Sequence, residues 1–200
     1  MLRVALTGGL AAGKSTASAY LRELGYPVVS ADVLAREAVA VGSDGLARVV
    51  EAFGPAVLTA SGELDRAALA EIVFNSPAER LRLEGIIHPI VRTETLRFLE
   101  AAEAAGAPAA IVDVPLLVET GQTNEYDLVV LVSAPVDLRL VRARERGLSR
   151  SEAIKRIAAQ ADDRARQAAA HIVLDGSRSV AELLRQIDES LIPILEHGES

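Results

Sequence analysis

Nine residues near the start of the sequence have the types and spacing of a phosphate-binding loop. Residues 8–16 read Gly-Gly-Leu-Ala-Ala-Gly-Lys-Ser-Thr and match G-x-x-x-x-G-K-[ST] directly after the apolar run at 2–7. Backbone N–H groups of such a loop face phosphate oxygens, because glycine lets the main chain approach closely and a helix begins there. Lys14 would reach the β and γ phosphates of a nucleoside triphosphate, and the Ser15 hydroxyl would bind Mg²⁺. The residues predicted to bind the nucleotide here are Gly9, Ala11, Ala12, Gly13, Lys14, Ser15 and Thr16.

Two carboxylates come at the ends of apolar runs that have the length of buried strands. Asp32 follows the run at 26–29, and Asp113 lies in the run at 109–114. The carboxyl ends of parallel strands meet at one edge of a sheet, so we expect Asp32 to lie beside the bound phosphates. There it could accept the proton of an acceptor hydroxyl, or it could cap the following helix. Asp113 could hold a Mg²⁺-bound water, or it could be a turn residue.

Short apolar runs alternate with segments of helical period along most of the chain. The strand-length runs lie at 3–7, 26–29, 109–114, 128–133 and 171–174. Strands that are apolar throughout predict an α/β fold, with a parallel sheet covered by helices on both faces. The interval 33–107 has mostly helical patterns, with interruptions at Gly54-Pro55, Ser61-Gly62 and His88-Pro89, and we expect it to be a helical insertion.

The charge distribution indicates a local site for a small anion. The 200 residues carry a net charge of -7 from 21 basic and 28 acidic side chains, which argues against whole-surface nucleic-acid binding. Segment 139–166 nevertheless holds nine basic and four acidic residues, a local charge of +5 that leaves -12 elsewhere. It could bind a small polyanion or be a solvated, arginine-rich helix face. Arg156 and Arg164 could simply pair with the adjacent acids, which are Glu152, Asp162 and Asp163.

What the sequence lacks excludes several classes of protein. There is no cysteine, and the three histidines are too scattered for a metal cluster. No apolar run reaches the roughly 18 residues of a membrane-spanning helix. The segment Asn124 to Asp127 lacks the lysine of an N-K-x-D guanine motif, which disfavours a GTPase. We therefore expect a cytoplasmic enzyme with small-molecule substrates and no nucleic-acid or membrane partner.

Beyond the loop, the sequence resembles the dephospho-CoA kinase family over almost its whole length. The phosphate loop is shared by many families, but His-Pro followed by V-P-L-L-x-E is typical of this one. The matching segments are 6–9, 13–16, Ala31-Asp32, Ala35-Arg36, 62–66, Val73-Phe74, 87–89, 114–119, 158–160 and 173–175.

The resemblance implies transfer of the ATP γ-phosphoryl group to the ribose 3'-hydroxyl of dephospho-CoA, with Mg²⁺ as cofactor. Asp32 would be the general base, and Ser15 and Asp113 would hold the metal. The acceptor would be bound by Arg36, His88, Pro115, Leu116, Leu117 and Glu119. Segment 139–166 would be a lid, and the core of a single kinase domain would comprise about 1–32, 108–138 and 167–200. His88 could instead only pack, and a kinase for another hydroxyl acceptor or a non-catalytic nucleotide-binding regulator stay as alternatives.

The sequence departs from the family pattern inside the loop and at the first carboxylate. Ala11-Ala12 stand where the family has glycine and serine. Alanine in the left-handed region costs about 1–2 kcal/mol, so we expect an ordinary, negative φ at Ala11. Ser30 replaces the first acid of the family's D-A-D, which makes Asp32 the only base candidate at this strand end.

Two further departures concern the lid and the last strand. Four lid arginines could match the family's positions, and we favour Arg139 and Arg144 as catalytic. Arg166 falls at a family-like arginine and is predicted to contact ATP. Gly176 replaces an asparagine, so an adenine contact there would use backbone groups or Asp175.

Overall fold

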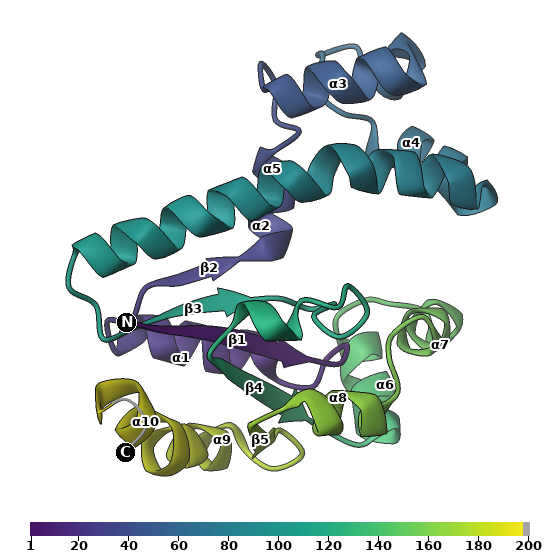
Figure 1. Cartoon of the computed structure of the whole chain (residues 1–200). Helices are drawn as coiled ribbons and strands as arrows, with labels where there is room; N and C mark the ends of the chain where they lie inside the picture. Colours follow the sequence, from purple (N-terminus) through teal and green to yellow (C-terminus); the bar gives the residue numbers. More distant parts are fainter. Residues whose placement is uncertain (198–200) are drawn as a thin grey trace. The chain divides into compact units, whose positions relative to one another are not determined.

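Five parallel strands form the sheet of this protein, and their carboxyl ends share one edge. The strands are β1 (Leu2–Gly8), β2 (Val28–Ser30), β3 (Ala109–Asp113), β4 (Leu128–Ser133) and β5 (Ile172–Asp175), in the order β2-β3-β1-β4-β5 (Figure 1). Asp113 is in register with Ser30 on one side and with Leu6 on the other. Gly8 pairs with Val132, and Ser133 with Asp175. The predicted α/β fold with a parallel sheet is therefore confirmed.

The computed structural model describes residues 1–197 and comprises two compact units. The first is made of Met1–Ser30 and the chain from Leu99 onward, and it contains the sheet; the second is Ala31–Phe98. The helix α5 (Pro77–Ala104) contributes residues to both units.

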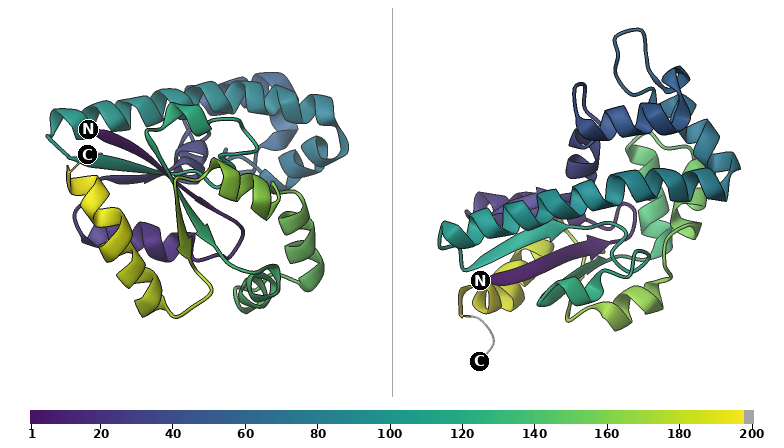
Figure 2. Two further views of the ribbon diagram at one scale, coloured as in Figure 1. Left: turned by 60° about the horizontal axis from the view of Figure 1, so that its bottom comes forward. Right: turned by 45° about the horizontal axis from the view of Figure 1, so that its top comes forward.

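Alternating side chains bury both faces of the sheet in the first unit. On one face, Leu6 and Val130 pack with Leu21 of α1 (Lys14–Glu23) and Leu183 of α9 (Val180–Gln186). On the other face, side chains such as Val129 are equally inaccessible. Burial on both sides explains why these strands are apolar throughout rather than alternating. Figure 2 shows α1 beside the strands, with α9 and α10 (Ile192–His197) nearby.

Three further helices of the first unit contain the basic segment. They are α6 (Val136–Glu145), α7 (Arg150–Ala158) and α8 (Asp163–Ala169). Ser149 and Glu152 form a reciprocal capping box at the start of α7, and the Asp162 side chain accepts the Ala165 N–H at 2.6 Å to cap α8. A five-residue π-helical turn, Ile187–Leu191, joins α9 to α10.

The second unit is helical, as expected for this part of the chain. It contains α2 (Ala31–Glu37), α3 (Asp44–Phe53), α4 (Arg66–Asn75) and the first part of α5, around a core of Val39, Val49, Val57 and Leu69. Asp65 caps α4 by accepting the Ala67 and Ala68 N–H groups, both at 3.0 Å.

The interruption predicted at His88-Pro89 is wrong, because α5 runs through both residues without a break. Proline removes one main-chain donor, but a helix of 28 residues retains its bonds on either side of that position.

Within residues 1–197, no helix has the length and apolar character needed to cross a membrane. The same part of the chain contains no cluster of three or more His, Asp or Glu side chains arranged for a metal ion.

Candidate active site

The loop between β1 and α1 has the backbone conformation of an anion-binding turn. Gly13, directly before α1, has a φ of 115°, a left-handed conformation that glycine adopts without steric cost. The Ala12 N–H donates to the Gly9 carbonyl at 3.1 Å, which closes the turn. The N–H groups that begin α1 therefore lie at the carboxyl edge of the sheet, where the helix dipole favours an anion.

The expectation of an ordinary φ at Ala11 is wrong. Ala11 has a φ of 58°, and it is the one non-glycine residue with positive φ in the described part of the chain. Its methyl group is buried in a small cluster with Ala143 of α6 and Ala153 of α7. This packing holds the residue in a conformation that alanine otherwise avoids.

The lysine predicted for the phosphates and the carboxylate predicted for the metal lie together. Lys14 Nζ donates a hydrogen bond to Asp113 Oδ1, and Ser18 Oγ lies 3.5 Å from the other carboxylate oxygen. Asp113 ends β3 and is only 7% exposed, so its charge requires a partner. The Asp113 carboxylate therefore faces the loop lysine.

Two arginines of the basic segment are buried beside the loop. The side chains of Arg139 on α6 and Arg166 on α8 are 2% and 4% exposed. Arg139 Nη2 donates to both oxygens of Asp163 at 3.0 Å, and Arg166 Nη2 donates to Oδ1 of the same carboxylate at 2.6 Å. Burial lowers the pKa of Arg139, and the positive charge of Arg166 lowers it further. The negative charge of Asp163 raises the pKa of Arg139.

Three nitrogens of these guanidinium groups have no hydrogen-bond partner within the described chain. They are Nε and Nη1 of Arg139 and Nη1 of Arg166. A Cβ added at Gly9 would collide with Nη1 of Arg139 and lie 3.0 Å from its Cζ, so the guanidinium lies directly over the loop. Buried donors without acceptors are costly, and buried charges more so. The arrangement therefore fits an anion that the loop and both arginines bind together.

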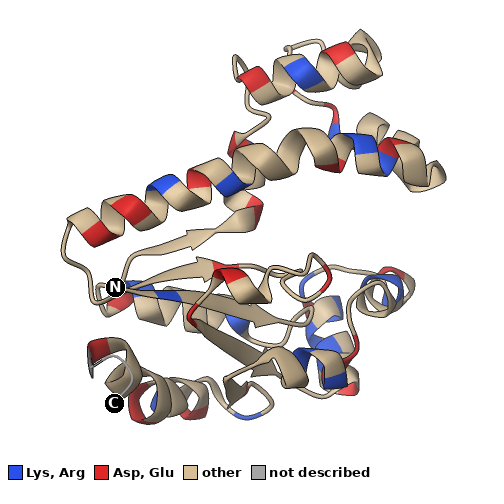
Figure 3. Ribbon diagram, in the orientation of Figure 1, with Lys and Arg blue, Asp and Glu red and all other residues tan. Residues whose placement is uncertain are grey.

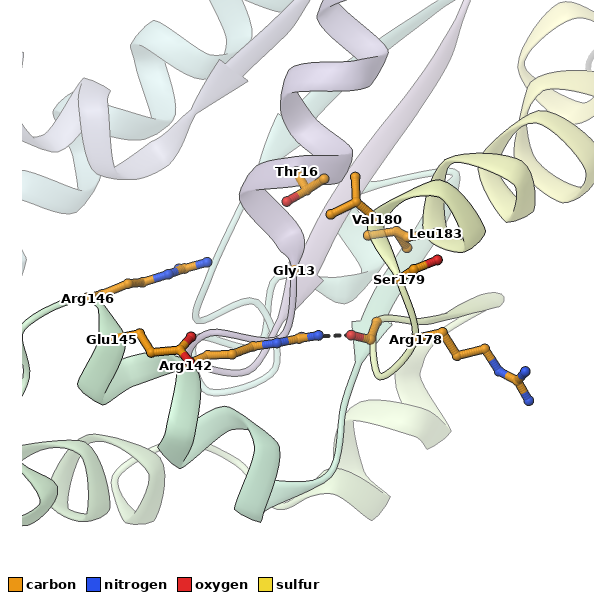
Figure 4. A pocket seen from close by; sticks show the side chains of 10 residues that line it. Gly13, Thr16, Arg142, Glu145, Arg146, Arg178, Ser179, Val180 and Leu183 are labelled. Atoms are coloured by element: carbon orange, nitrogen blue, oxygen red, sulfur yellow. Dashed lines mark hydrogen bonds between the residues drawn. The ribbon is translucent and has the colours of Figure 1, made fainter.

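A pocket of about 280 Å³ lies at the other end of the loop, beside Gly13 and Thr16. Arg142 lines this pocket and donates to the Gly176 carbonyl at 2.7 Å. Arg178 points away from Gly13 (Figure 4). The Asp175 carboxylate accepts the Ser177 N–H at 2.8 Å. Hydrogen bonding from the Ser177 side chain, and then from its backbone, lowers the pKa of Asp175. Gly176, rather than the Asp175 side chain, lines the pocket.

The remaining lid arginines lie apart from the loop or do not form the predicted pairs. Arg144 lines a separate open groove between α6 and α7, together with Arg150 and Glu152. Among the described residues, neither Arg156 nor Arg164 has an ion pair within 4.0 Å with the acids of this segment: Asp163 binds Arg139 and Arg166, and Asp162 caps α8. Arg156 nevertheless interacts with Glu152 at longer range, since its charge contributes to lowering the pKa of Glu152. Figure 3 shows how the basic residues concentrate on α6, α7 and α8.

The segment Pro115–Glu119 is connected to the loop through the end of the basic segment. Glu119 Oε1 accepts the Ala161 N–H at 2.6 Å, and Gln160 Oε1 accepts the Leu10 N–H at 2.9 Å. Leu117 is fully buried, whereas Leu116 is 47% exposed. Gln160 and Asp163 were missed as site residues, because helical periodicity gives no signal for contacts across 150 residues of sequence or between separate helices.

Three predicted site residues belong to the second unit. Asp32 and Arg36 lie in the first and last turns of α2, and both are exposed. Because α2 begins at Ala31, Asp32 lies inside the helix rather than at its cap. His88 is exposed on α5, so it does not pack in the core of this unit.

The comparisons with known proteins agree on one family. The dephospho-CoA kinase family model matches residues 2–182. The chain belongs to the dephospho-CoA kinase family. A dephospho-CoA kinase of Frankia casuarinae is 47% identical over 189 residues, which are 94% of this chain and 82% of that protein. One from Geobacillus kaustophilus is 43% identical over 93% of each chain, and a longer one from Mycolicibacterium paratuberculosis is 45% identical, with 46% of its length covered.

Solved structures extend the agreement to the fold. The Thermus thermophilus protein TT1252 has a TM-score of 0.84 at 34% identity. The match covers 96% of this chain and 97% of that protein. Dephospho-CoA kinase from Campylobacter jejuni has a TM-score of 0.69 at 26% identity, with 94% and 96% covered. A shikimate kinase from Acinetobacter baumannii has a TM-score of 0.51 at 16% identity, which shows a shared fold alone. The chain is thus a kinase of coenzyme A biosynthesis that uses a nucleotide co-substrate.

Proposed function

We propose that this dephospho-CoA kinase transfers the γ-phosphoryl group of ATP to the ribose 3'-hydroxyl of dephospho-CoA. The observation that carries the proposal is the pair of buried arginines beside the loop, with the unpartnered Nη1 of Arg139 over Gly9 and a second unpartnered Nη1 on Arg166. Positive groups fixed around a transferred phosphoryl group stabilise the charge of its transition state. The absence of cysteine fits a reducing, cytoplasmic setting.

The loop and its neighbours would hold the triphosphate. The main-chain N–H groups of Ala11 and of Gly13, Lys14 and Ser15 would bind the phosphates, since those of Ala12 and Thr16 donate to the Gly9 and Gly13 carbonyls. Lys14 would move its donors from Asp113 toward the β and γ phosphates. Ser15 and Asp113 are hard oxygen ligands, as Mg²⁺ prefers, and they fit a metal that would supply charge neutralisation at the phosphates. The pocket beside Gly13 would take the adenine base, with Arg142 and the Gly176 backbone at its wall.

Asp32 would act as the general base. Ser30 ends β2 in register with Asp113, and two residues of chain separate the Cα atoms of Ser30 and Asp32 by at most about 7 Å. The 3'-hydroxyl oxygen forms the new bond to the γ-phosphorus while its proton passes to Asp32. The β–γ bridging bond breaks, and ADP leaves.

The acceptor would be bound by Arg36, His88 and the segment 115–119, with 139–166 as the lid. Exposed Leu116 offers apolar surface, and Arg36 offers charge for an acceptor phosphate. Arg144, in its separate groove, would reach the phosphates only if the lid moves.

An acceptor panel tests the reaction. Purified protein with ATP and Mg²⁺ should release ADP when dephospho-CoA is added, and a nucleoside or shikimate in its place should leave the rate at background. Acceptor-dependent ADP with a nucleoside but none with dephospho-CoA would replace this proposal by that of another small-molecule kinase.

Substitution of the base tests the mechanism. Asp32→Asn should lower kcat by about 10²–10⁴-fold and leave ATP affinity unchanged, because the carboxylate acts on the acceptor. The matched control is Asp44→Asn, an acid in the first turn of another helix of the same unit. Equal, small effects of both substitutions would remove Asp32 from the mechanism.

A further inference from the structure

Asp163 is the carboxylate that holds both buried arginines beside the loop. It accepts from Nη2 of Arg139 through both oxygens and from Nη2 of Arg166 through Oδ1. The two Nη2 atoms bond to one oxygen, at 3.0 and 2.6 Å, so they lie at most 5.6 Å apart, the sum of the two distances. Two like charges at this separation repel each other strongly when they are buried. Asp163 therefore offsets the repulsion that would drive the guanidinium groups apart.

The bonds to Asp163 also fix which nitrogens stay available. Each arginine uses Nη2 for the carboxylate, and the buried nitrogens left over are Nε and Nη1 of Arg139 and Nη1 of Arg166. The contact of Arg139 Nη1 with Gly9 shows that the free edge of Arg139 faces the phosphate loop. The Arg166 atom nearest Gly9 is Nη2, the nitrogen that donates to Asp163. The planar fork of a guanidinium group allows this division, since it presents donors on separate edges.

We propose that Asp163 is a positioning residue, which clamps Arg139 and Arg166 by their Nη2 atoms and thereby directs the remaining nitrogens of Arg139 at the terminal phosphate. The identity of that phosphate rests on the proposed kinase function, whereas the clamp itself does not. Asp163 acts through the arginines. Its effect therefore falls on the rate of transfer rather than on acceptor binding.

Asp163 is the suitable residue to substitute, because it is the exposed member of this cluster. Its side chain is 41% exposed, while those of its two partners are almost fully buried. Asp163→Asn preserves the size of the side chain, removes its charge and replaces one acceptor by a donor that guanidinium groups repel. Asp163→Glu keeps the charge on a side chain that is one methylene longer.

The adjacent acid provides a matched control. Asp162 accepts the Ala165 N–H and caps the same helix, but it forms no ion pair with Arg139 or Arg166 in the described structure. Asp162→Asn therefore reports any effect of perturbing the start of α8 without touching the clamp.

The test combines steady-state kinetics with NMR of ¹⁵N-labelled arginine side chains. We expect Asp163→Asn to lower kcat by about 10–100-fold, because misplacement of about 1 Å can cost 10²-fold. The KM for dephospho-CoA should change by less than about 3-fold, Asp163→Glu should recover a large part of the rate, and Asp162→Asn should retain wild-type kcat. The Arg139 Nη signals should be separate in the wild type, because the clamp slows guanidinium rotation, and they should merge in Asp163→Asn.

Three results would overturn the clamp. They are a wild-type kcat in Asp163→Asn, an equal loss in Asp162→Asn, or Arg139 signals that do not respond to the loss of the carboxylate. The NMR measurement needs no catalysis. A wild-type protein that does not phosphorylate dephospho-CoA, but whose Arg139 signals merge in Asp163→Asn, would therefore refute the proposed function and keep the clamp.

Discussion

The left-handed alanine of the phosphate loop leads to an unusual prediction about stability. Ala11→Gly removes strain of about 1–2 kcal/mol that a φ of 58° imposes on alanine. It also removes a buried methyl group, and this loss lowers the free energy of unfolding by about 0.8 kcal/mol. Glycine gives the unfolded chain more conformational freedom, which lowers the free energy of unfolding further, by about 0.4–1 kcal/mol. These contributions nearly cancel, so the free energy of unfolding should stay within about 0.8 kcal/mol of the wild-type value.

Ala17 supplies the matched control, since it is equally buried but lies in the interior of α1. Ala17→Gly relieves no strain, and it should cost about 2 kcal/mol from lower helix propensity and the lost methyl group. Both residues belong to the first unit, so urea unfolding followed by far-UV circular dichroism reports the same transition for both. If Ala11→Gly destabilises the protein as much as Ala17→Gly does, Ala11 is not strained and the reasoning fails.

Two other perturbations test the loop and the lid. Gly9→Ala should lower kcat by at least about 10²-fold, because the new Cβ collides with Arg139, which Asp163 prevents from turning aside; a wild-type kcat would contradict this. Hydrogen bonds from the Ser149 side chain and backbone lower the pKa of Glu152 below its ordinary 4.5. The resulting stabilisation is present above pH 4.5 and is lost as the pH falls through the lowered pKa. The wild type should therefore have a higher free energy of unfolding in urea than Glu152→Gln above pH 4.5, and this difference should disappear below the lowered pKa. A difference in the free energy of unfolding that stays the same between pH 6 and pH 3 would refute this role of Glu152.

The features that could be predicted from the sequence are those that local chemistry determines. The loop pattern and the apolar strands each depend on neighbouring residues, and each has its expected structure. Position at a strand end was sufficient to bring Asp113 to Lys14, because a parallel sheet aligns its carboxyl ends.

The features that could not be predicted depend on contacts between distant segments. The φ of Ala11 follows from packing on Ala143 and Ala153, which no rule for a single residue contains. The partners of Asp163 come from α6 as well as from α8, whereas sequence proximity indicated only neighbouring arginines. Helix α5 continues through Pro89, although a His-Pro pair usually indicates a boundary.

A crystal structure with a non-hydrolysable ATP analogue, Mg²⁺ and dephospho-CoA would show both substrates in the site. We expect Arg139 Nη1 and Arg166 Nη1 within hydrogen-bond distance of the terminal phosphate, and the Asp32 carboxylate on the ribose 3'-hydroxyl. A terminal phosphate out of reach of both arginines, or a 3'-hydroxyl that faces a different base, would contradict this expectation.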